Sequence, residues 1–239
     1  MIREIFKLDR FNGSNMGKIS TGSSSLDVFL QGGYDDEIIT TIYGTSGVGK
    51  TNLCLLAVVR VAESGKKVIF IDTEGGIAIE RIKQLSDKFH TVLENIIFFH
   101  PVNFEEQKEI FDNLRGFITE NVGLIVVDSI SMLYRLELGK SEEVYEVNSS
   151  LGKQIGILVE ISRRRNIPVL LTNQVYADFD KRDQVKMVGG DLLKYGSKCL
   201  LELQRFANCR GVVLRKHRSM PEGKELKFKI VEKGIEVVE

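Results

Sequence analysis

Residues 44–51 constrain the fold of this chain more than any other stretch, because they match the pattern G-x-x-x-x-G-K-[ST] at every fixed position. Residues 38–43, which precede them, are mostly β-branched and apolar, and residues 50–63 carry apolar side chains at helical spacing. Strand, glycine-rich loop and helix in this order predict a phosphate-binding loop. Its residues are Gly44, Thr45, Ser46, Gly47, Val48, Gly49, Lys50 and Thr51.

Each residue type in this loop has a physical reason to be there. The glycines let the backbone curl so that successive N–H groups converge on phosphate oxygens, and the start of the following helix adds its positive dipole end. Lys50 is expected to reach the β- and γ-phosphates, and the Thr51 hydroxyl to bind Mg²⁺. We therefore expect ATP and Mg²⁺ as cofactors. The alternative is a glycine-rich turn followed by Lys-Thr by chance, which the flanking strand and helix disfavour.

Two further runs predict buried parallel strands that end in acidic residues. Residues 67–72 end in Asp72 and are followed two residues later by Glu74. Residues 123–128 are mostly apolar and end in Asp128. Ligands of open α/β sheets bind at the carboxyl ends of the strands. The second run has the Walker B form, which presents Asp128 towards the Mg²⁺ held at Thr51. A surface-turn aspartate is the alternative for Asp128.

Composition limits the classes of partner and compartment. The 33 basic and 33 acidic residues cancel, so any DNA-binding surface must be a local patch. None of Cys54, Cys199 and Cys209 lies in a C-x-x-C arrangement, which favours buried thiols in a reducing compartment over zinc. The first residues are too charged for a signal peptide, and no apolar run reaches membrane-spanning length. We expect a soluble cytoplasmic protein with no membrane partner.

The order of the predicted elements favours an α/β fold. Residues 1–20 are expected to be a short lead-in and residues 21–239 a single domain. Beyond the runs above, we expect helices at 23–30, 77–89, 103–120 and 144–165, an irregular loop at 129–143, strands at 96–99, 167–172, 199–206, 212–216, 226–231 and 235–238, and a mobile loop at 175–188. This order predicts a mostly parallel sheet with helices on both faces and an antiparallel C-terminal extension.

Taken together, the motifs resemble those of the RecA/RadA recombinase family, and the likeness extends from residue 18 nearly to the end. Its most specific parts are residues 19–23 followed by Leu26-Asp27, residues 71–75, and residues 171–175. The resemblance implies a RecA-like ATPase core that acts with DNA in homologous recombination. It also implies roles for three side chains. Glu74 would activate the attacking water, Arg81 would stack on adenine, and Gln174 would sense the γ-phosphate and relay its presence to the DNA-binding loop.

Physical arguments support two of these roles. A carboxylate beside the phosphate loop can orient water for in-line attack, and an amide at a strand end can report whether a γ-phosphate is present. Each residue also has a simpler interpretation. Glu74 could cap the backbone at Gly75-Gly76, Arg81 could be a solvated helix residue, and Gln174 could satisfy loop backbone.

The resemblance points to two segments as DNA contacts. Lys181, Arg182 and Lys186 lie where the family binds single strands, beside an aromatic residue that could stack a base, although interspersed aspartates dilute the charge. Lys216 and Arg218 form the second basic segment. In RecA-like ATPases a Lys-x-Arg at this place reaches a neighbouring subunit's phosphate. Without an oligomer it would be an exposed cationic turn that can contact the DNA backbone.

Two departures from the family pattern bear on function. Full recombinases carry an N-terminal DNA-binding domain and a Phe-x-x-Ala polymerisation motif, and residues 1–20 contain neither. The loop after Gln174 is also short, so filament formation and efficient strand exchange are not expected. The sequence therefore favours an accessory protein that binds ATP and single-stranded DNA, hydrolyses ATP weakly and assists the main recombinase. A filament-forming recombinase and a KaiC-like regulatory ATPase are the alternatives.

Overall fold

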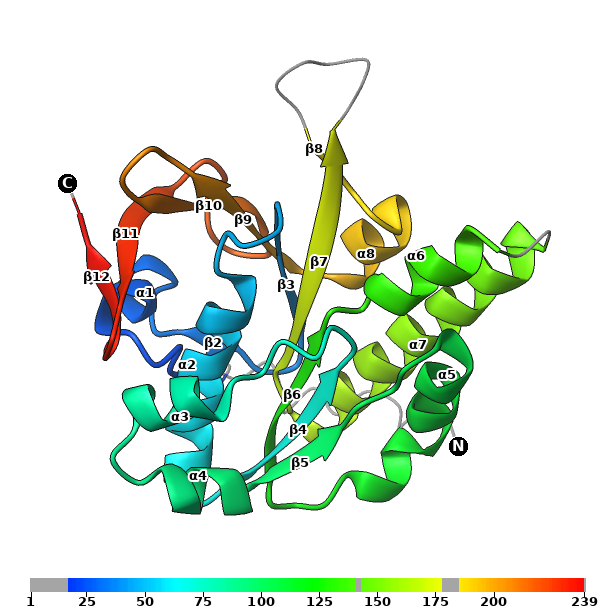
Figure 1. Cartoon of the computed structure of the whole chain (residues 1–239), viewed down its shortest axis with the longest axis horizontal. Coiled ribbons are helices and arrows are strands. Elements are labelled where there is room, and N and C mark those ends of the chain that lie inside the picture. Colours follow the sequence, from blue (N-terminus) through cyan, green and yellow to red (C-terminus); the bar gives the residue numbers. More distant parts are fainter. Residues whose placement is uncertain (1–16, 141–142, 178–184, 239) are drawn as a thin grey trace, which may run out of the picture.

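The computed structural model describes residues 17–140, 143–177 and 185–238. Within them, a ten-stranded mixed sheet lies between two layers of helices (Figure 1). This arrangement confirms the predicted α/β fold. Residues 1–16 of the predicted lead-in, together with Lys181 and Arg182, lie outside the described residues. No helix in the described segments is both long and apolar enough to cross a membrane.

The large sheet has the strand order β12-β11-β10-β9-β3-β7-β6-β4-β5, and β8 pairs with β7. Strands β9, β3, β7, β6, β4 and β5 are mutually parallel, whereas β10, β11 and β12 extend the sheet from β9 as consecutive antiparallel strands. The bounds are β3 (Ile39–Gly44), β4 (Lys67–Asp72), β5 (Ile96–Phe99), β6 (Val122–Asp128), β7 (Val169–Ala177), β8 (Val185–Met187), β9 (Cys199–Arg205), β10 (Arg210–His217), β11 (Glu225–Val231) and β12 (Gly234–Val237). A separate two-stranded sheet joins β1 (Lys18–Ile19) to β2 (Tyr34–Asp35).

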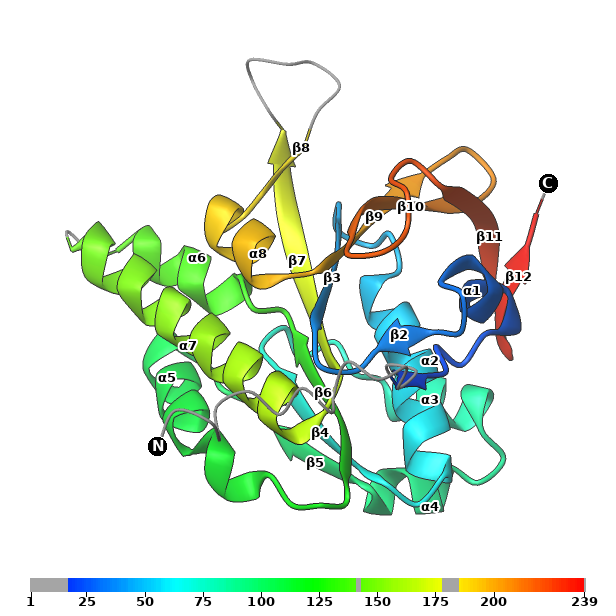
Figure 2. The same cartoon turned by 180° about the vertical axis from the view of Figure 1, so that it is seen from behind.

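The helices cover the two faces of the sheet and bury its apolar strands. One core lies under α2, α3 and α4 and includes Phe70 and Phe228, and the other lies under α5, α6 and α7 and includes Ile125. Figure 2 shows α5 and α7 together on the second face. The helices are α1 (Ser24–Phe29), α2 (Lys50–Glu63), α3 (Ile79–Leu85), α4 (Phe89–Glu94), α5 (Phe104–Asn113), α6 (Met132–Leu138), α7 (Val144–Arg165) and α8 (Gly190–Gly196), with a 3-10 turn at Leu114–Phe117.

Three predicted boundaries are wrong. The helix expected at 77–89 is divided into α3 and α4, because Ser86 adopts an extended backbone between them. The helix expected to reach residue 120 ends as α5 at Asn113 and continues as the 3-10 turn. The expected irregular loop at 129–143 contains α6, which buries Leu133 and Tyr134. Charged residues of both signs surround these two residues in the sequence, so the apolar pattern of the helix could not be recognised there.

The loop predicted at 175–188 is shorter in the structure. Strand β7 continues to Ala177 and pairs antiparallel with β8, so that Tyr176 lies opposite Lys186 and Val175 opposite Met187. Met187 is buried near Tyr43, which explains why this run forms a strand despite its polar neighbours. The hairpin of β7 and β8 extends beyond the ends of the other strands (Figure 1). The rest of the predicted loop, residues 178–184, lies outside the described residues.

Side-chain caps fix the start of α5. Asn103 Oδ1 accepts a hydrogen bond from the Glu106 backbone N–H at 2.9 Å, and Glu106 Oε2 accepts one from the Val102 N–H at 3.0 Å. The first bond satisfies a backbone donor that the helix leaves free at its first turn, and the second satisfies the N–H of the residue before the N-cap. The cap therefore fixes the start of one of the helices that cover the second face of the sheet.

Replacing Asn103 with alanine should lower the free energy of unfolding by about 1 kcal/mol, because the N-cap acceptor is lost. Equilibrium unfolding in urea measures this change. Asn103→Ser supplies another good cap acceptor and should retain most of the stability. Equal destabilisation by serine and alanine would show that the cap does not act through this hydrogen bond.

Candidate active site

The phosphate-loop sequence joins the end of β3 to the start of α2, as predicted. Residues Ile39–Gly44 of β3 are all buried, so the loop begins from a fixed point at the carboxyl edge of the sheet. Gly44 is required by close packing, since a Cβ there would lie 2.5 Å from the Leu203 carbonyl oxygen. Gly49, with φ +109°, lets the chain turn from the loop into the helix. The backbone is therefore shaped as an anion cradle at a helix N-terminus.

Lys50 is held inside this cradle by its own loop. Its ammonium group donates to the carbonyl oxygens of Gly44 at 3.1 Å and Thr45 at 3.0 Å. Burial lowers the pKa of Lys50, and the nearby carboxylates of Glu74 and Asp128 act in the opposite direction. A cation that is buried with only carbonyl ligands gains from the arrival of an anion. The site thus provides charge where a phosphate would bind.

The Walker B aspartate meets the phosphate loop across the sheet. Thr51 Oγ1 donates to Asp128 Oδ2 at 2.6 Å, although the two residues are 77 positions apart. Thr172, inside β7, donates its hydroxyl to the other oxygen of Asp128. Burial raises the pKa of Asp128, and the hydrogen bonds from Thr172 and Thr51 oppose that rise. Sequence reasoning predicted that Asp128 faces the Mg²⁺ held at Thr51. It predicted neither their direct hydrogen bond nor the contact from Thr172, whose only signal was its place at the end of the predicted strand 167–172.

These groups fit Mg²⁺ held together with a nucleotide. A hydroxyl and one carboxylate oxygen are hard ligands of the kind that Mg²⁺ takes, with water and phosphate oxygens as the remaining ligands. The described residues contain no cluster of three or more His, Cys, Asp or Glu that could hold a metal by protein groups alone. Thr51 and Asp128 would therefore hold Mg²⁺ only as part of a nucleotide complex.

Glu74 and Gln174 lie in direct contact, although they are 100 residues apart. Gln174 Nε2 donates to Glu74 Oε1 at 2.8 Å, and Ser129 Oγ donates to the same oxygen at 2.7 Å. Asp72, and not Glu74, caps the glycine turn, because its Oδ1 accepts from the backbone N–H of Gly75 at 2.8 Å. The alternative interpretation, in which Glu74 caps the backbone at Gly75-Gly76, is therefore wrong. Ser129 was not among the predicted site residues.

Arg81 connects the start of α2 to the C-terminal hairpin. Its Nε donates to Asn52 Oδ1 at 2.8 Å, directly after the phosphate loop. The guanidinium also donates to the backbone oxygens of Glu232 at 2.9 Å and Val231 at 3.0 Å, in the turn between β11 and β12. The structure thus places Arg81 beside the phosphate loop and bonds it to the backbone. Its role in adenine stacking stays a prediction.

Lys216 is placed away from the phosphate loop and is bonded within its own chain. Its ammonium group donates to the carbonyl oxygens of Lys194 and of Ser197, the latter at 2.9 Å, where α8 ends. A cation at a helix C-terminus compensates the negative dipole end. In this chain alone, Lys216 therefore stabilises the end of α8.

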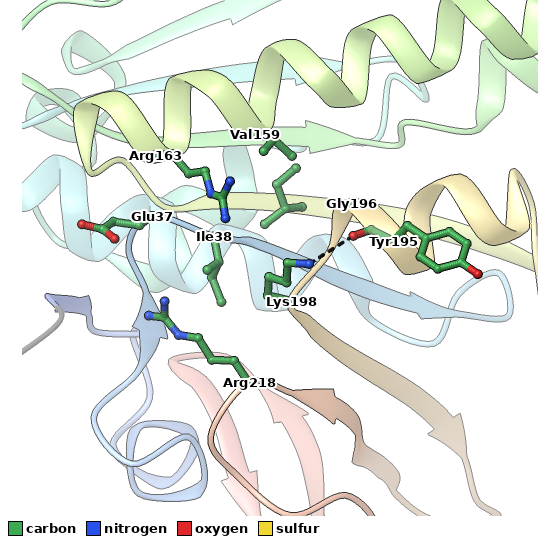
Figure 3. A pocket seen from close by; sticks show the side chains of 9 residues that line it. Glu37, Ile38, Val159, Arg163, Tyr195, Gly196, Lys198 and Arg218 are labelled. Atoms are coloured by element: carbon green, nitrogen blue, oxygen red, sulfur yellow. Dashed lines mark hydrogen bonds between the residues drawn. The ribbon is translucent and has the colours of Figure 1, made fainter. Parts of the chain in front are cut away.

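Arg218 lies at the opposite edge of the sheet from the phosphate loop. It lines a pocket of about 370 Å³ with Arg163 and Lys198, next to the amino ends of β3 and β9 (Figure 3). Its Nε donates to Asp35 at 3.1 Å. Burial acts to raise the pKa of Asp35, but the hydrogen bonds from His217 and Lys18 outweigh it and hold that pKa well below its usual range. Arg218 is thus part of a local ion-pair cluster.

The predicted residues fall into two groups. The first group lies together at the carboxyl ends of β3, β4 and β6, where β7 passes beside them: Lys50, Thr51, Asp128, Glu74 and Gln174. Of the predicted DNA contacts, Lys186 is exposed on β8, and Lys216 and Arg218 lie elsewhere. Cys54 and Cys199 are buried as expected, whereas Cys209 is half-buried.

Comparison with known proteins gives consistent results. The family model described as Rad51 matches residues 12–238. The chain is 45% identical over 215 residues to the "DNA repair and recombination protein RadB" of Methanococcus maripaludis, which covers 89% of this chain and 97% of that protein. It is 42% identical over 216 residues to the protein of the same name from Methanocaldococcus jannaschii, covering 90% and 100%.

A solved structure supports the same assignment. The crystal structure of the RadB recombinase superposes with a TM-score of 0.78 at 38% identity and covers 92% of this chain and 100% of that chain. The family match over residues 12–238, together with relatives and a solved structure that are similar over most of the chain, shows that this chain belongs to the Rad51 family.

Proposed function

We propose that this chain is an accessory protein of DNA repair and homologous recombination, which binds ATP and single-stranded DNA and assists a main recombinase. The observation that carries the proposal is the contact between Glu74, beside the phosphate loop, and Gln174, at the base of the β7–β8 hairpin. The names of its relatives support a role in repair and recombination. In this proposal the chain hydrolyses ATP slowly and has little or no DNA strand-exchange activity of its own.

Nucleotide binding would use the loop backbone, Lys50, Thr51 and Asp128. Lys50 offers a buried cation for the β- and γ-phosphates. Thr51 and Asp128, which already meet at 2.6 Å, would hold Mg²⁺. When bound, Mg²⁺ bridges phosphate oxygens and neutralises charge on them. The two threonine hydroxyls on Asp128 keep its carboxylate oriented towards this point.

Glu74 is suited to orient the attacking water. Its Oε1 is fixed by Ser129 and Gln174, and its Oε2 has no hydrogen-bond partner in the described residues. A carboxylate with one oxygen fixed and the other free can accept a proton from water in a defined direction. Gln174 would lose or change its bond to Glu74 according to whether a γ-phosphate is present, and β7 carries that change directly into the hairpin.

In this proposal ATP hydrolysis is slow, and the positions of Lys216 and Arg218 support that part of it. A cation that approaches the γ-phosphate as charge develops can accelerate phosphoryl transfer by roughly 10³ or more. In this chain Lys216 bonds the end of α8 and Arg218 bonds Asp35, so both have partners within their own chain. The nucleotide would therefore act mainly as a conformational switch.

The β7–β8 hairpin is the proposed DNA site. Tyr176, which is 48% exposed, lies directly across the strand pair from Lys186. An aromatic side chain beside a cation suits a single strand, because bases stack on the ring and the phosphate meets the charge. Sequence reasoning placed Lys186 in this site and missed Tyr176.

Replacing Lys50 with alanine should lower ATP affinity about 10- to 100-fold, because a charge-assisted contact to phosphate contributes about 1.5–3 kcal/mol. Isothermal titration calorimetry measures this loss. Arg60→Ala removes an exposed charge from the other end of α2 and should leave the affinity unchanged. Parental affinity in Lys50→Ala would disprove nucleotide binding at this loop.

Replacing Glu74 with glutamine should preserve ATP binding and abolish the residual hydrolysis, because the shape is kept and the base is lost. Phosphate release under single-turnover conditions, together with calorimetry, separates the two effects. If the glutamine variant hydrolyses ATP at the parental rate, Glu74 is not the base.

Replacing Lys181, Arg182 and Lys186 together with alanine should weaken binding to single-stranded DNA and reduce its salt dependence, because fewer phosphates are neutralised. Fluorescence anisotropy over a range of salt concentrations measures both quantities. The matched control replaces Arg163, Arg164 and Arg165, which removes the same charge at the end of α7. Equal losses in the two triple variants would indicate a general charge effect and not a DNA site at the hairpin.

A further inference from the structure

The C-terminal extension of the sheet packs directly on the phosphate loop. A Cβ placed at Gly49 would lie 2.8 Å from Ile230 Cδ1, 3.6 Å from Arg210 Cδ and 3.7 Å from Arg210 Nε. The side chain of Arg210 therefore runs along the backbone of the loop, one residue before Lys50. Strand β10 carries Arg210, and β11 carries Ile230.

Packing within the extension holds Arg210 on this side of the sheet. Arg210 is paired in register with Phe228 of β11, so the two side chains project from the same face. Phe228 is fully buried in the core that also contains α2. The position of Arg210 is thus set by the core and not by a flexible surface loop.

The guanidinium of Arg210 contains a buried nitrogen that is unpaired among the described residues. Its Nε is buried and makes no hydrogen bond in the described part of the chain. The residues paired with it across the two neighbouring strands are Arg205 and Phe228, and neither offers a carboxylate. A buried donor without an acceptor is unfavourable, and a second arginine opposite it adds like charge. Both features are relieved by an anion.

The neighbouring loop is itself an anion cradle, which identifies the class of ligand. We propose that Arg210 is a second phosphate-binding side chain of this site and contacts the α- or β-phosphate of the nucleotide. The inference rests on the proposed binding of ATP. Arginine suits this place because its planar fork matches phosphate oxygens, whereas a lysine ammonium is a point charge.

The sheet order places Arg210 on the side of the loop away from the catalytic groups. Strand β10 lies two strands from β3 in one direction, and β6 and β4, which carry Asp128 and Asp72, lie in the other. Backbone N–H groups of the loop cradle the α- and β-phosphates, and Arg210 lies beside that backbone at Gly49. Arg210 therefore acts on phosphates that ATP and ADP share, and it does not distinguish the two.

The test compares Arg210→Ala and Arg210→Lys with Lys229→Ala by calorimetry with ATP, ADP and adenosine. Lys229 is exposed on β11, on the opposite face from Phe228, and its loss removes the same charge. Arg210→Ala should lower the affinities for ATP and for ADP by a similar factor of about 10 or more and leave the affinity for adenosine unchanged. It should also reduce the thermal stabilisation of the protein by inorganic pyrophosphate. The lysine variant should recover part of the loss, and Lys229→Ala should bind like the parent.

Two outcomes would overturn the inference. Parental affinity of Arg210→Ala for ATP and ADP would show that Arg210 does not bind phosphate. An equal loss for adenosine would show that Arg210 acts only by supporting the fold. If Lys50→Ala no longer binds ATP and Arg210→Ala binds it with parental affinity, only this inference fails. A parent protein that does not bind ATP would instead overturn the proposed function and this inference together.

Discussion

The hydrogen bond from Thr51 to the buried carboxylate of Asp128 joins the two halves of the candidate active site. Burial alone would favour the neutral form of Asp128, and the hydroxyl donors of Thr51 and Thr172 oppose that tendency. Thr51 comes from α2, Asp128 from the end of β6 and Thr172 from the interior of β7. They meet because β6 and β3 flank β7 in a parallel sheet whose carboxyl ends share one edge. The apolar strands therefore decide the position of every polar group in the site.

The same edge of the sheet connects the site to its surroundings in two directions. On one side, Glu74 bonds Gln174, and β7 continues from Gln174 into the hairpin with β8. On the other side, β10 and β11 pack Arg210 and Ile230 against the loop, and Arg81 bonds the turn that follows β11. The phosphate loop thus lies between a segment suited to report nucleotide state and one suited to hold the nucleotide.

Sequence reasoning predicted the parts of the site that depend on local order. The loop motif and the strand ends at Asp128 and Glu74 follow from apolar runs and the residues directly after them. The partners Thr172 and Ser129 could not be predicted in the same way, because their contacts depend on the register between strands that are distant in sequence. Helices α6 and α8 were missed because both are short and partly exposed, so their periodicity is weak. Arg210 belongs to the same class, since only the packing of the extension brings it to the loop.

The central claim is that nucleotide state passes through the Glu74–Gln174 contact to the β7–β8 hairpin. Hydrogen exchange of the backbone amides at 175–177 and 185–188 tests it most directly, with a non-hydrolysable ATP analogue and with ADP, in the parent and in Gln174→Ala. The account predicts that exchange in the parent differs between the two nucleotides and that Gln174→Ala binds both but removes the difference. Identical exchange in the parent with both nucleotides, or a difference that persists in Gln174→Ala, would contradict the account.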